Sequence, residues 1–318
     1  MSKIITYNET PLAIELIAET FETSFQQKFD ADYWRWRFQQ NPFSKKIYIA
    51  YILEDDLLAA YYAVSPITLT DGKTEYKFAL SNMTMTHPAH QGKGYFKLIS
   101  QKIVEELKKD GFDGIVGFAN NNSHHGFKKY LGWCDLSVLM LFQLDIESSV
   151  EADSAEINFN DCVLSNELIE TISSFNSLAN SQFSFSRSAK FIKWRLLTIP
   201  NKKYRAILQT QNNNILAITV YKAFGREIDV MEHFEHLPIT KTEKLRIKYG
   251  IGFLRNKYKG IINIWSNVHS KEHLILEKMG FKETTFSTNF GIIPFTEKSR
   301  HLLNYENWHY RFLDSDVF

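Results

Sequence analysis

The residues with the clearest chemical meaning form a glycine turn at residues 91–96, with the sequence Gln-Gly-Lys-Gly-Tyr-Phe. Glycine tolerates backbone angles that other residues rarely adopt, and it lets another molecule approach the main chain closely. An amphipathic helix is predicted to begin near residue 94, so its first N–H groups have no partners within the helix. Such free donors, together with the positive end of the helix dipole, bind anions such as a diphosphate. The turn therefore predicts a site for a nucleotide-type cofactor.

Two other phosphate-binding motifs do not fit this turn. It lacks the Gly-Lys-Ser/Thr ending of the nucleotide-hydrolase loop, and its glycines do not have the G-x-G-x-x-G spacing of dinucleotide-binding enzymes. The strand predicted before the turn also belongs to an antiparallel run. A nucleotide hydrolase or a dehydrogenase is therefore not expected.

The elements that must position the turn follow from the hydrophobic pattern. A strand at 75–86 leads into the turn, and a helix at 94–109 leaves it with apolar residues on one face. Gly111 is suited to end that helix. A strand at 113–119 comes next, and the asparagine-rich residues 120–123 are typical of a helix N-cap. The other elements predicted in this half are a strand at 3–7, helices at 11–25 and 31–40, and strands at 46–53, 57–69 and 136–144.

A repeated anchor divides the chain in two. Tryptophan, arginine and proline stand in register in residues 36–42 and 194–200, and each copy is followed by a Lys-Lys pair and two predicted strands. In the second copy the corresponding segment, residues 237–244, contains no glycine. A polar, turn-rich segment at 147–155 predicts a linker. Because 318 residues suit two domains, we place these at residues 1–146 and 156–318.

Composition indicates an ordinary globular protein. Hydrophobic residues make up 44% of the chain, charged residues 23%, and the formal net charge is +1. The sequence has neither a run of about 18 apolar residues nor the apolar core of a signal peptide. Its cysteines, Cys134 and Cys162, have no metal or disulfide spacing. We therefore expect a cytoplasmic protein with free thiols, no nucleic-acid partner and no membrane span.

Residues 40–145 resemble the GNAT acyltransferases. Their turn is similar to the family signature [RQ]-x-x-G-x-[GA], with Gln91 and Gly94 in place and Phe96 departing from the last position. A splayed strand, an asparagine-rich helix start and a Gly-Trp ending follow in the family's order. The second half looks like a degenerate copy. The resemblance implies an α/β (α+β) fold of two tandem modules, each a mixed, mostly antiparallel sheet flanked by helices.

The resemblance also implies acetyl-CoA or another acyl-CoA as the donor co-substrate. The strand before the turn would pair its backbone with the extended pantetheine arm, as an added strand does. A backbone N–H near Met85 would polarise the thioester carbonyl. The residues that are expected to bind the cofactor are Met85, Thr86, Gln91, Gly92, Lys93, Gly94, Tyr95, Phe96 and Asn121.

The acceptor implied by the resemblance is a small-molecule amine, which attacks the thioester directly in a ternary complex, as in an N-acetyltransferase. An amine with a solution pKa of about 10 must first lose a proton. The sequence does not choose among the candidate bases, which are Glu75, His87, His124 and His125. Where the family often has a tyrosine that protonates the leaving thiolate, this chain has Lys128, and the nearby Tyr130 is predicted to face the core. The histidines lack a metal-ligand spacing, so no metal site is expected.

Two other functions stay open. An aminoacyltransferase that extends cell-wall peptides uses a similar doubled fold but draws on aminoacyl-tRNA, and the intact diphosphate turn and near-neutral charge disfavour it. A non-catalytic acyl-CoA-binding module would fit the missing tyrosine.

An aromatic and basic segment at residues 34–38 offers candidate substrate contacts, because tryptophan and arginine stack and bind anions well. Trp36 recurs in the second copy as Trp194, which favours a core position. Trp34 and Arg35 are not repeated, so these two are the candidate contacts.

Overall fold

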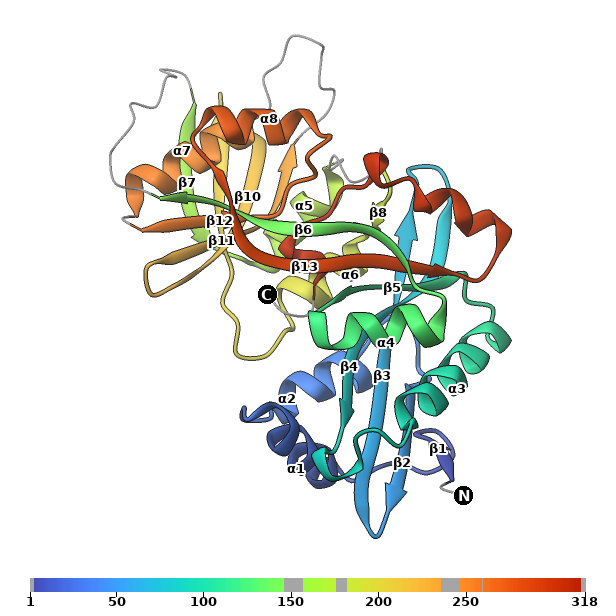
Figure 1. The fold of residues 1–318 in the computed structure, drawn as a ribbon. Helices are drawn as coiled ribbons and strands as arrows, with labels where there is room; N and C mark the ends of the chain where they lie inside the picture. Colours follow the sequence, from blue (N-terminus) through green and yellow to red (C-terminus); the bar gives the residue numbers. More distant parts are fainter. Residues whose placement is uncertain (1–2, 146–156, 176–181, 236–245, 259, 316–318) are drawn as a thin grey trace. The chain divides into compact units, whose positions relative to one another are not determined.

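The computed structural model describes residues 3–145, 157–175, 182–235, 246–258 and 260–315, and these divide into two compact units (Figure 1). The first unit comprises residues 1–69, 75–138 and 288–303. The second comprises residues 70–74, 139–287 and 304–318.

The first unit is a mixed sheet with helices on both faces. Strands β1, β2, β3 and β4 lie side by side in that order, and the pairs β1–β2 and β2–β3 are antiparallel. Strand β5 is parallel to β4, and β13 is antiparallel to β5. The strands are β1 (Ile4–Thr6), β2 (Tyr48–Glu54), β3 (Leu57–Thr70), β4 (Glu75–Thr86), β5 (Gly114–Ala119) and β13 (Lys282–Pro294). The helices are α1 (Ile14–Phe25), α2 (Ala31–Trp34), the π-helix η1 (Arg35–Gln39), the 3₁₀ turn η2 (Pro88–His90), α3 (Tyr95–Lys109), α4 (Asn121–Leu131) and the 3₁₀ segment η4 (Glu297–Leu303).

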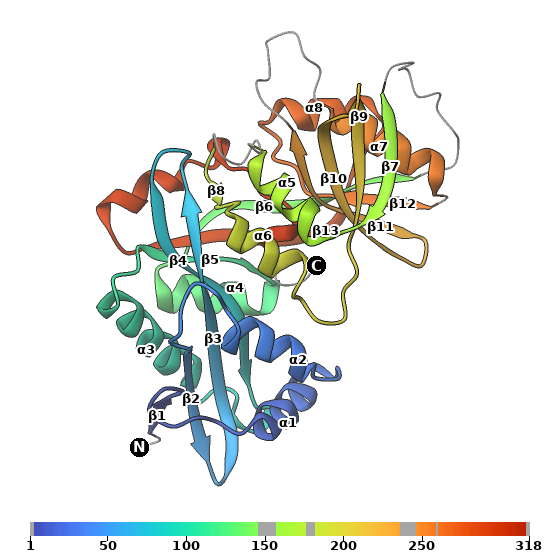
Figure 2. The same ribbon diagram turned by 180° about the vertical axis from the view of Figure 1, so that it is seen from behind.

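Strand β3 separates two apolar cores, because successive side chains of a strand point to opposite faces. Tyr62 and Val64 pack in the core beneath α3 and α4. Tyr61 and Ala63 pack in the core beneath α1 and α2. Figures 1 and 2 show these two helix pairs covering opposite faces of the sheet. The predicted helix at 94–109 and its apolar face are confirmed, since Ile99, with Ile103 and Leu107, is buried on the sheet.

The second unit also combines one parallel strand pair with antiparallel neighbours, in the order β6-β12-β11-β10-β9-β7. These strands are β6 (Cys134–Asp145), β7 (Asn158–Val163), β9 (Arg205–Gln211), β10 (Asn214–Phe224), β11 (Glu227–Glu235) and β12 (Ile261–Ile264). The other elements are α5 (Asn166–Ser174), β8 (Ser184–Phe185), α6 (Ala189–Leu196), α7 (Ile247–Lys257), α8 (Lys271–Lys278) and the 3₁₀ turns η5 (Tyr305–Asn307) and η6 (Phe312–Asp314).

Each unit takes a strand from the other half of the sequence. In the first unit, β5 pairs with residues 289–294 of β13, near the end of the chain. In the second, β12 pairs with residues 142–145 of β6. A division at residues 146 and 156 therefore does not describe the compact units. Strand β6 follows β5 in sequence but pairs with β12. Strand β13 provides the hydrogen-bond partners for the backbone groups on the edge of β5.

Candidate functional site

Strand β4 has an open backbone edge in the first unit. Its parallel pairing with β5 covers only residues 78–80, which lie opposite residues 114–116. Beyond Leu80 the strand continues to Thr86 without β5 as its neighbour. Unpaired N–H and C=O groups of this kind accept an extended ligand as an added strand.

A change of face within β4 marks a β-bulge. Ala79 belongs to the core beneath α3 and α4, and the Ser81 hydroxyl lies 3.1 Å from that of Tyr62 in the same core. Met83 and Met85 instead pack in the core beneath α1 and α2. Odd-numbered residues therefore switch faces after Ser81, which requires one extra residue in the strand.

The bulge decides which N–H groups face the open edge. The His87 N–H donates to Ala59 O of β3 at 3.0 Å. Because alternate residues of a strand direct their N–H groups to the same side, that of Met85 also faces β3. Thr84 and Thr86 direct theirs to the opposite edge. The N–H near Met85 that is predicted to polarise a thioester would then be that of Thr84 or Thr86, since the Met85 N–H faces β3.

The glycine turn has the predicted backbone geometry. Gly92 and Gly94 adopt φ angles of +79° and +77°, in the left-handed region that favours glycine. Gly94 is the N-cap of α3, and no side chain caps the helix there. A Cβ atom built on either glycine would meet no atom within 4 Å, so the space over the turn is open. Free helix N–H groups below an open surface fit a diphosphate.

Glu54, at the end of β2, holds the turn from the side. Its carboxylate accepts hydrogen bonds from Lys93 Nζ at 2.9 Å and Tyr95 Oη at 2.8 Å, and lies 2.7 Å from His90 Nδ1. The hydrogen bonds from Lys93 and Tyr95 lower the pKa of Glu54 to about 2. Lys93, predicted to contact the cofactor, is thus paired with a carboxylate. No local sequence pattern links Glu54 to the turn, because 39 positions separate it from Lys93.

Phe96, the departure from the signature, has room between α3 and α4. Its ring centroid lies 5.6 Å from that of Phe127 and 6.3 Å from that of Tyr130. A Cβ atom at Gly126 would come within 2.9 Å of the Phe96 ring, so a glycine in α4 accommodates the larger residue. Tyr130 is half-buried, and its ring packs edge-on against that of Phe96.

The start of α4 is capped as predicted. Asn120 is the N-cap, and its side chain accepts hydrogen bonds from the Asn122 and Ser123 N–H groups at 3.1 and 3.0 Å. Asn121 is exposed, and its Oδ1 accepts a hydrogen bond of 3.3 Å from Asn289 Nδ2 of β13. The carbonyl end of Asn121 is thereby fixed, and its amide N–H₂ group is the end that can donate to a ligand.

The candidate bases lie in different places. Glu75 is the first residue of β4, about 36 Å from Thr86 at 3.3 Å per residue, so it is remote from the turn. His87 accepts a hydrogen bond from the Ala89 N–H at 3.2 Å through Nδ1. His125 is exposed on α4.

His124 and Lys128 share one carboxylate on the surface of the first unit. His124 Nε2 lies 2.6 Å from Asp135 Oδ1, and Lys128 Nζ lies 2.7 Å from Asp135 Oδ2. Partial burial would raise the pKa of Asp135, but hydrogen bonds from Lys128 and His124 keep it below its usual value. Lys128, which stands where the family often has tyrosine, is thus an ion-pair partner.

The tryptophans of the segment 34–38 are both buried. Trp34 is 1% exposed, and its Nε1 donates to Tyr61 Oη at 2.8 Å. The prediction that Trp34 contacts substrate is therefore wrong, because the indole is part of the core beneath α1 and α2. Trp36 is also 1% exposed, as predicted. Arg35 is exposed and pairs with Asp32 at 3.0 Å.

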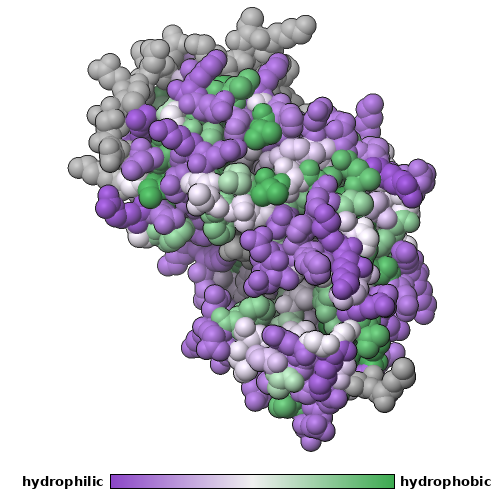
Figure 3. All heavy atoms as spheres, in the orientation of Figure 1, coloured by the Kyte–Doolittle hydropathy of each residue, from purple (hydrophilic) through white to green (hydrophobic). Residues whose placement is uncertain are grey.

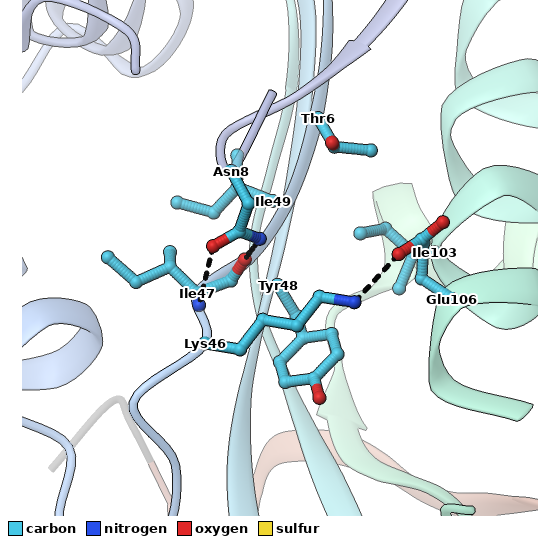
Figure 4. Close-up of a pocket in the computed structure, with 8 residues that line it drawn as sticks. All are labelled: Thr6, Asn8, Lys46, Ile47, Tyr48, Ile49, Ile103 and Glu106. Atoms are coloured by element: carbon cyan, nitrogen blue, oxygen red, sulfur yellow. Dashed lines mark hydrogen bonds and ion pairs between the residues drawn. The ribbon is translucent and has the colours of Figure 1, made fainter. Parts of the chain in front are cut away.

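A shallow surface pocket lies near the other end of α3. Lys46 points toward Glu106 in Figure 4 and binds both Glu106 and Asp110, at 2.8 and 2.7 Å. The residues that line this pocket are Thr6, Asn8, Lys46, Ile47, Tyr48, Ile49, Ile103 and Glu106. Because Glu106 lies near the C-terminal end of α3, this pocket is separate from the glycine turn at the N-terminal end.

Several wider properties of the described residues bear on function. Cys134 and Cys162 are free, as predicted. Within the described ranges, no three His, Cys, Asp or Glu side chains gather closely enough to hold a metal ion. Of the helices that the structure describes, none has the length and apolarity to cross a bilayer. On the face shown in Figure 3, hydrophilic side chains predominate and hydrophobic ones are scattered among them.

A mixed α/β fold whose open strand leads into a glycine turn at a helix N-terminus defines an acyltransferase-like domain. Residues 3–133 match the model of the family described as Acetyltransferase (GNAT) domain. No curated protein sequence matches the chain.

Solved structures share the fold at low sequence identity. A conserved protein of unknown function from Enterococcus faecalis, a probable N-acyltransferase, has a TM-score of 0.68 and 12% identity over 92% of this chain and 72% of its own. A GCN5-related N-acetyltransferase from Anabaena variabilis has the same TM-score and identity over 91% and 72%. N-myristoyltransferase of Saccharomyces cerevisiae with bound myristoyl-CoA has a TM-score of 0.62 and 10% identity over 92% and 78%.

Proposed function

We propose that this chain is an acyl-CoA-dependent N-acyltransferase that transfers an acetyl group from acetyl-CoA to a small-molecule amine in the cytoplasm. The observation that carries this proposal is the glycine turn, where Gly92 and Gly94 leave the first N–H groups of α3 uncapped and open. The open edge of β4 leads directly into that turn. The GNAT family match over residues 3–133 supports the same conclusion.

The cofactor contacts follow from the two features. The diphosphate would accept hydrogen bonds from the backbone at residues 92–96, each worth about 1.5–3 kcal/mol for a charged acceptor. The pantetheine arm would pair with the open edge of β4 at Thr86, and the amide of Asn121 would donate to it from the start of α4. Acyl-CoA supplies the activated thioester.

In the proposed reaction the amine attacks the thioester carbonyl directly. A carbon–nitrogen bond forms and the carbon–sulfur bond breaks, without an acyl-enzyme intermediate. The Thr84 N–H would donate to the carbonyl oxygen, where negative charge develops. The proton lost by the amine passes to a base or to water, and the leaving thiolate takes up a proton. Among the candidate bases, His87 lies directly after β4, at the end of the open edge.

Release of free thiol from acetyl-CoA with a panel of small amines tests this function. Amine-dependent thiol release together with mass-spectrometric detection of the acetylated amine would support it. Binding of acetyl-CoA without turnover of any amine would favour the non-catalytic module. Transfer that requires aminoacyl-tRNA would favour the peptide-extending enzyme.

A further inference from the structure

One side chain at the β4 bulge has a donor group without a partner. Ser65 is fully buried on β3, and its hydroxyl donates to Asn82 Oδ1 at 2.6 Å. Because Oδ1 is the end of the amide that Ser65 holds, Nδ2 is directed elsewhere. Nδ2 is buried and has no hydrogen-bond partner among the described residues. A buried donor without a partner is unfavourable, so a ligand atom that accepts from Nδ2 would bind favourably.

The position of Asn82 relates this donor to the open edge of β4. Asn82 lies between Leu80, the last residue paired with β5, and Thr84, whose N–H faces the open edge. Thr84 Oγ1 is likewise buried without a partner within the described ranges. Two unsatisfied polar groups thus flank the stretch where the proposed thioester would lie. A buried polar group without a partner in a folded chain calls for an explanation, and a ligand is one.

Asn82 lies on one of the two faces of the sheet from which a nucleophile can attack. A thioester carbonyl that accepts from the Thr84 N–H lies near the plane of the sheet, because strand N–H groups point along that plane. A nucleophile approaches a carbonyl carbon from above or below the plane of the carbonyl group. When that plane lies along the sheet, the nucleophile arrives from one face of the sheet. Ser65 lies on the same face as Tyr61 and Ala63, beneath α1 and α2, since it follows their alternation in β3. Its partner Asn82 therefore projects to that face.

We propose that Asn82, aligned by Ser65, is a positioning residue that donates a hydrogen bond from Nδ2 to an oxygen of the acceptor. The preferred acceptors are then amines that carry a hydroxyl or carbonyl oxygen close to the nitrogen, rather than plain alkylamines. This inference rests on the proposed N-acyltransferase function and specifies its substrate class. A site with a fixed donor discriminates against a substrate that lacks the matching acceptor atom.

Matched amines test the proposal in the full chain. Acetylation of 2-aminoethanol is compared with that of propylamine, and acetylation of glycinamide with that of isobutylamine, for wild type and Asn82→Leu. The variant should lose about tenfold to a hundredfold in kcat/KM for the oxygen-containing amines and change less than about twofold for the alkylamines. The KM for acetyl-CoA should not change. Asn160→Leu, at an exposed asparagine of β7 in the second unit, is the matched control.

The outcomes separate this inference from the proposed function. An equal loss for both kinds of amine, or an unchanged preference in Asn82→Leu, would overturn the role of Asn82 while leaving the transferase intact. Failure of wild type to acetylate any amine overturns both. If Asn82→Leu does not fold, Ser65→Ala keeps the amide but removes its alignment. That variant should show a smaller loss confined to the oxygen-containing amines, and an equal loss for both kinds would again overturn the proposal.

Discussion

Glu54 and Lys93 form an ion pair of 2.9 Å that joins the end of β2 to the glycine turn. The same carboxylate accepts a hydrogen bond from Tyr95, the first residue of α3. A negative charge therefore stands beside the proposed diphosphate site, balanced by the cation that the turn itself supplies.

Substitution of Glu54 should strengthen cofactor binding. Glu54→Gln keeps an oxygen for the Tyr95 hydroxyl but removes the charge, which frees Lys93 to interact with the diphosphate. Isothermal calorimetry should show acetyl-CoA binding tighter by about two- to fivefold, the range expected for an exposed ion pair. Asp56→Asn changes an exposed carboxylate in the adjacent turn and should have no effect. Weaker binding by Glu54→Gln would mean that the carboxylate orders the turn.

A negative charge at Gly94 should weaken cofactor binding. Asparagine and aspartate have the same shape and both tolerate positive φ, so Gly94→Asn reports the effect of the side chain and Gly94→Asp adds its charge. Calorimetry should show acetyl-CoA binding at least about tenfold weaker for Gly94→Asp than for Gly94→Asn, because the carboxylate repels the diphosphate. Equal affinities of the two variants would show that the diphosphate binds elsewhere.

The strand that β13 contributes to the first unit should be essential for stability. A Cβ atom at Gly291 would lie 2.3 Å from the Trp133 ring and 2.6 Å from the Cys134 carbonyl oxygen. Gly291→Ala should therefore lower the free energy of unfolding by about 1–3 kcal/mol. Urea denaturation followed by tryptophan fluorescence measures the change.

A second glycine supplies the matched control for Gly291→Ala. A Cβ atom at Gly252 in α7 would meet nothing within 4 Å, so Gly252→Ala should raise stability by about 0.8–1 kcal/mol through helix propensity. Similar effects at both positions would contradict the close packing of β13 on Trp133.

Acid should destabilise the second unit through Glu232. Burial by itself would raise the pKa of Glu232, but Arg187, His309 and Arg311 lower it below its usual value. A carboxyl whose pKa is lower in the folded state stabilises the fold above its unfolded pKa of about 4.3, and this contribution is lost as the pH falls below that value. Its ion pair with Arg187 is 2.6 Å long, and both side chains are buried.

The variant Glu232→Gln tests this linkage. It leaves the buried Arg187 guanidinium without one of the carboxylates that balance its charge. Urea denaturation at pH 7 should therefore show a free energy of unfolding that is lower by about 3–5 kcal/mol. Between pH 5 and pH 3 its stability should fall less steeply than that of wild type. The exposed Glu105→Gln on α3 should leave both the stability at pH 7 and its pH dependence unchanged. A parallel pH profile for Glu232→Gln and wild type would refute the argument.

The features that the sequence predicted correctly depend on neighbouring residues. The helix of α3, its buried face and the positive φ angles of Gly92 and Gly94 follow from local periodicity and from the properties of glycine. The Asn120 cap needs only its own side chain and the next N–H groups. Interactions between neighbouring residues can be read from the sequence itself, and they sufficed to predict the glycine turn and the helix that follows it.

The errors arose where the partner lies far away in the chain. A single-residue bulge in β4 reversed the orientation of the Met85 N–H, and no local signal marked it. Trp34 is buried in a core that also contains Tyr61. Tyr61, which accepts the hydrogen bond from the Trp34 indole, lies 27 positions away on β3. Glu54 reaches the turn across 39 positions. Contacts over such separations depend on which strands pair, and this is a property of the whole sheet.

The sequence by itself thus determined that a turn with left-handed glycines forms, which helix follows it and which family signature it resembles, because all three depend on neighbouring residues. Only the tertiary structure decided that β13 completes the first unit, that Thr84 rather than Met85 faces the open edge, and that Ser65 directs the Asn82 amide. Those outcomes depend on strand pairing and side-chain burial between distant segments, and such long-range contacts form only when the chain folds.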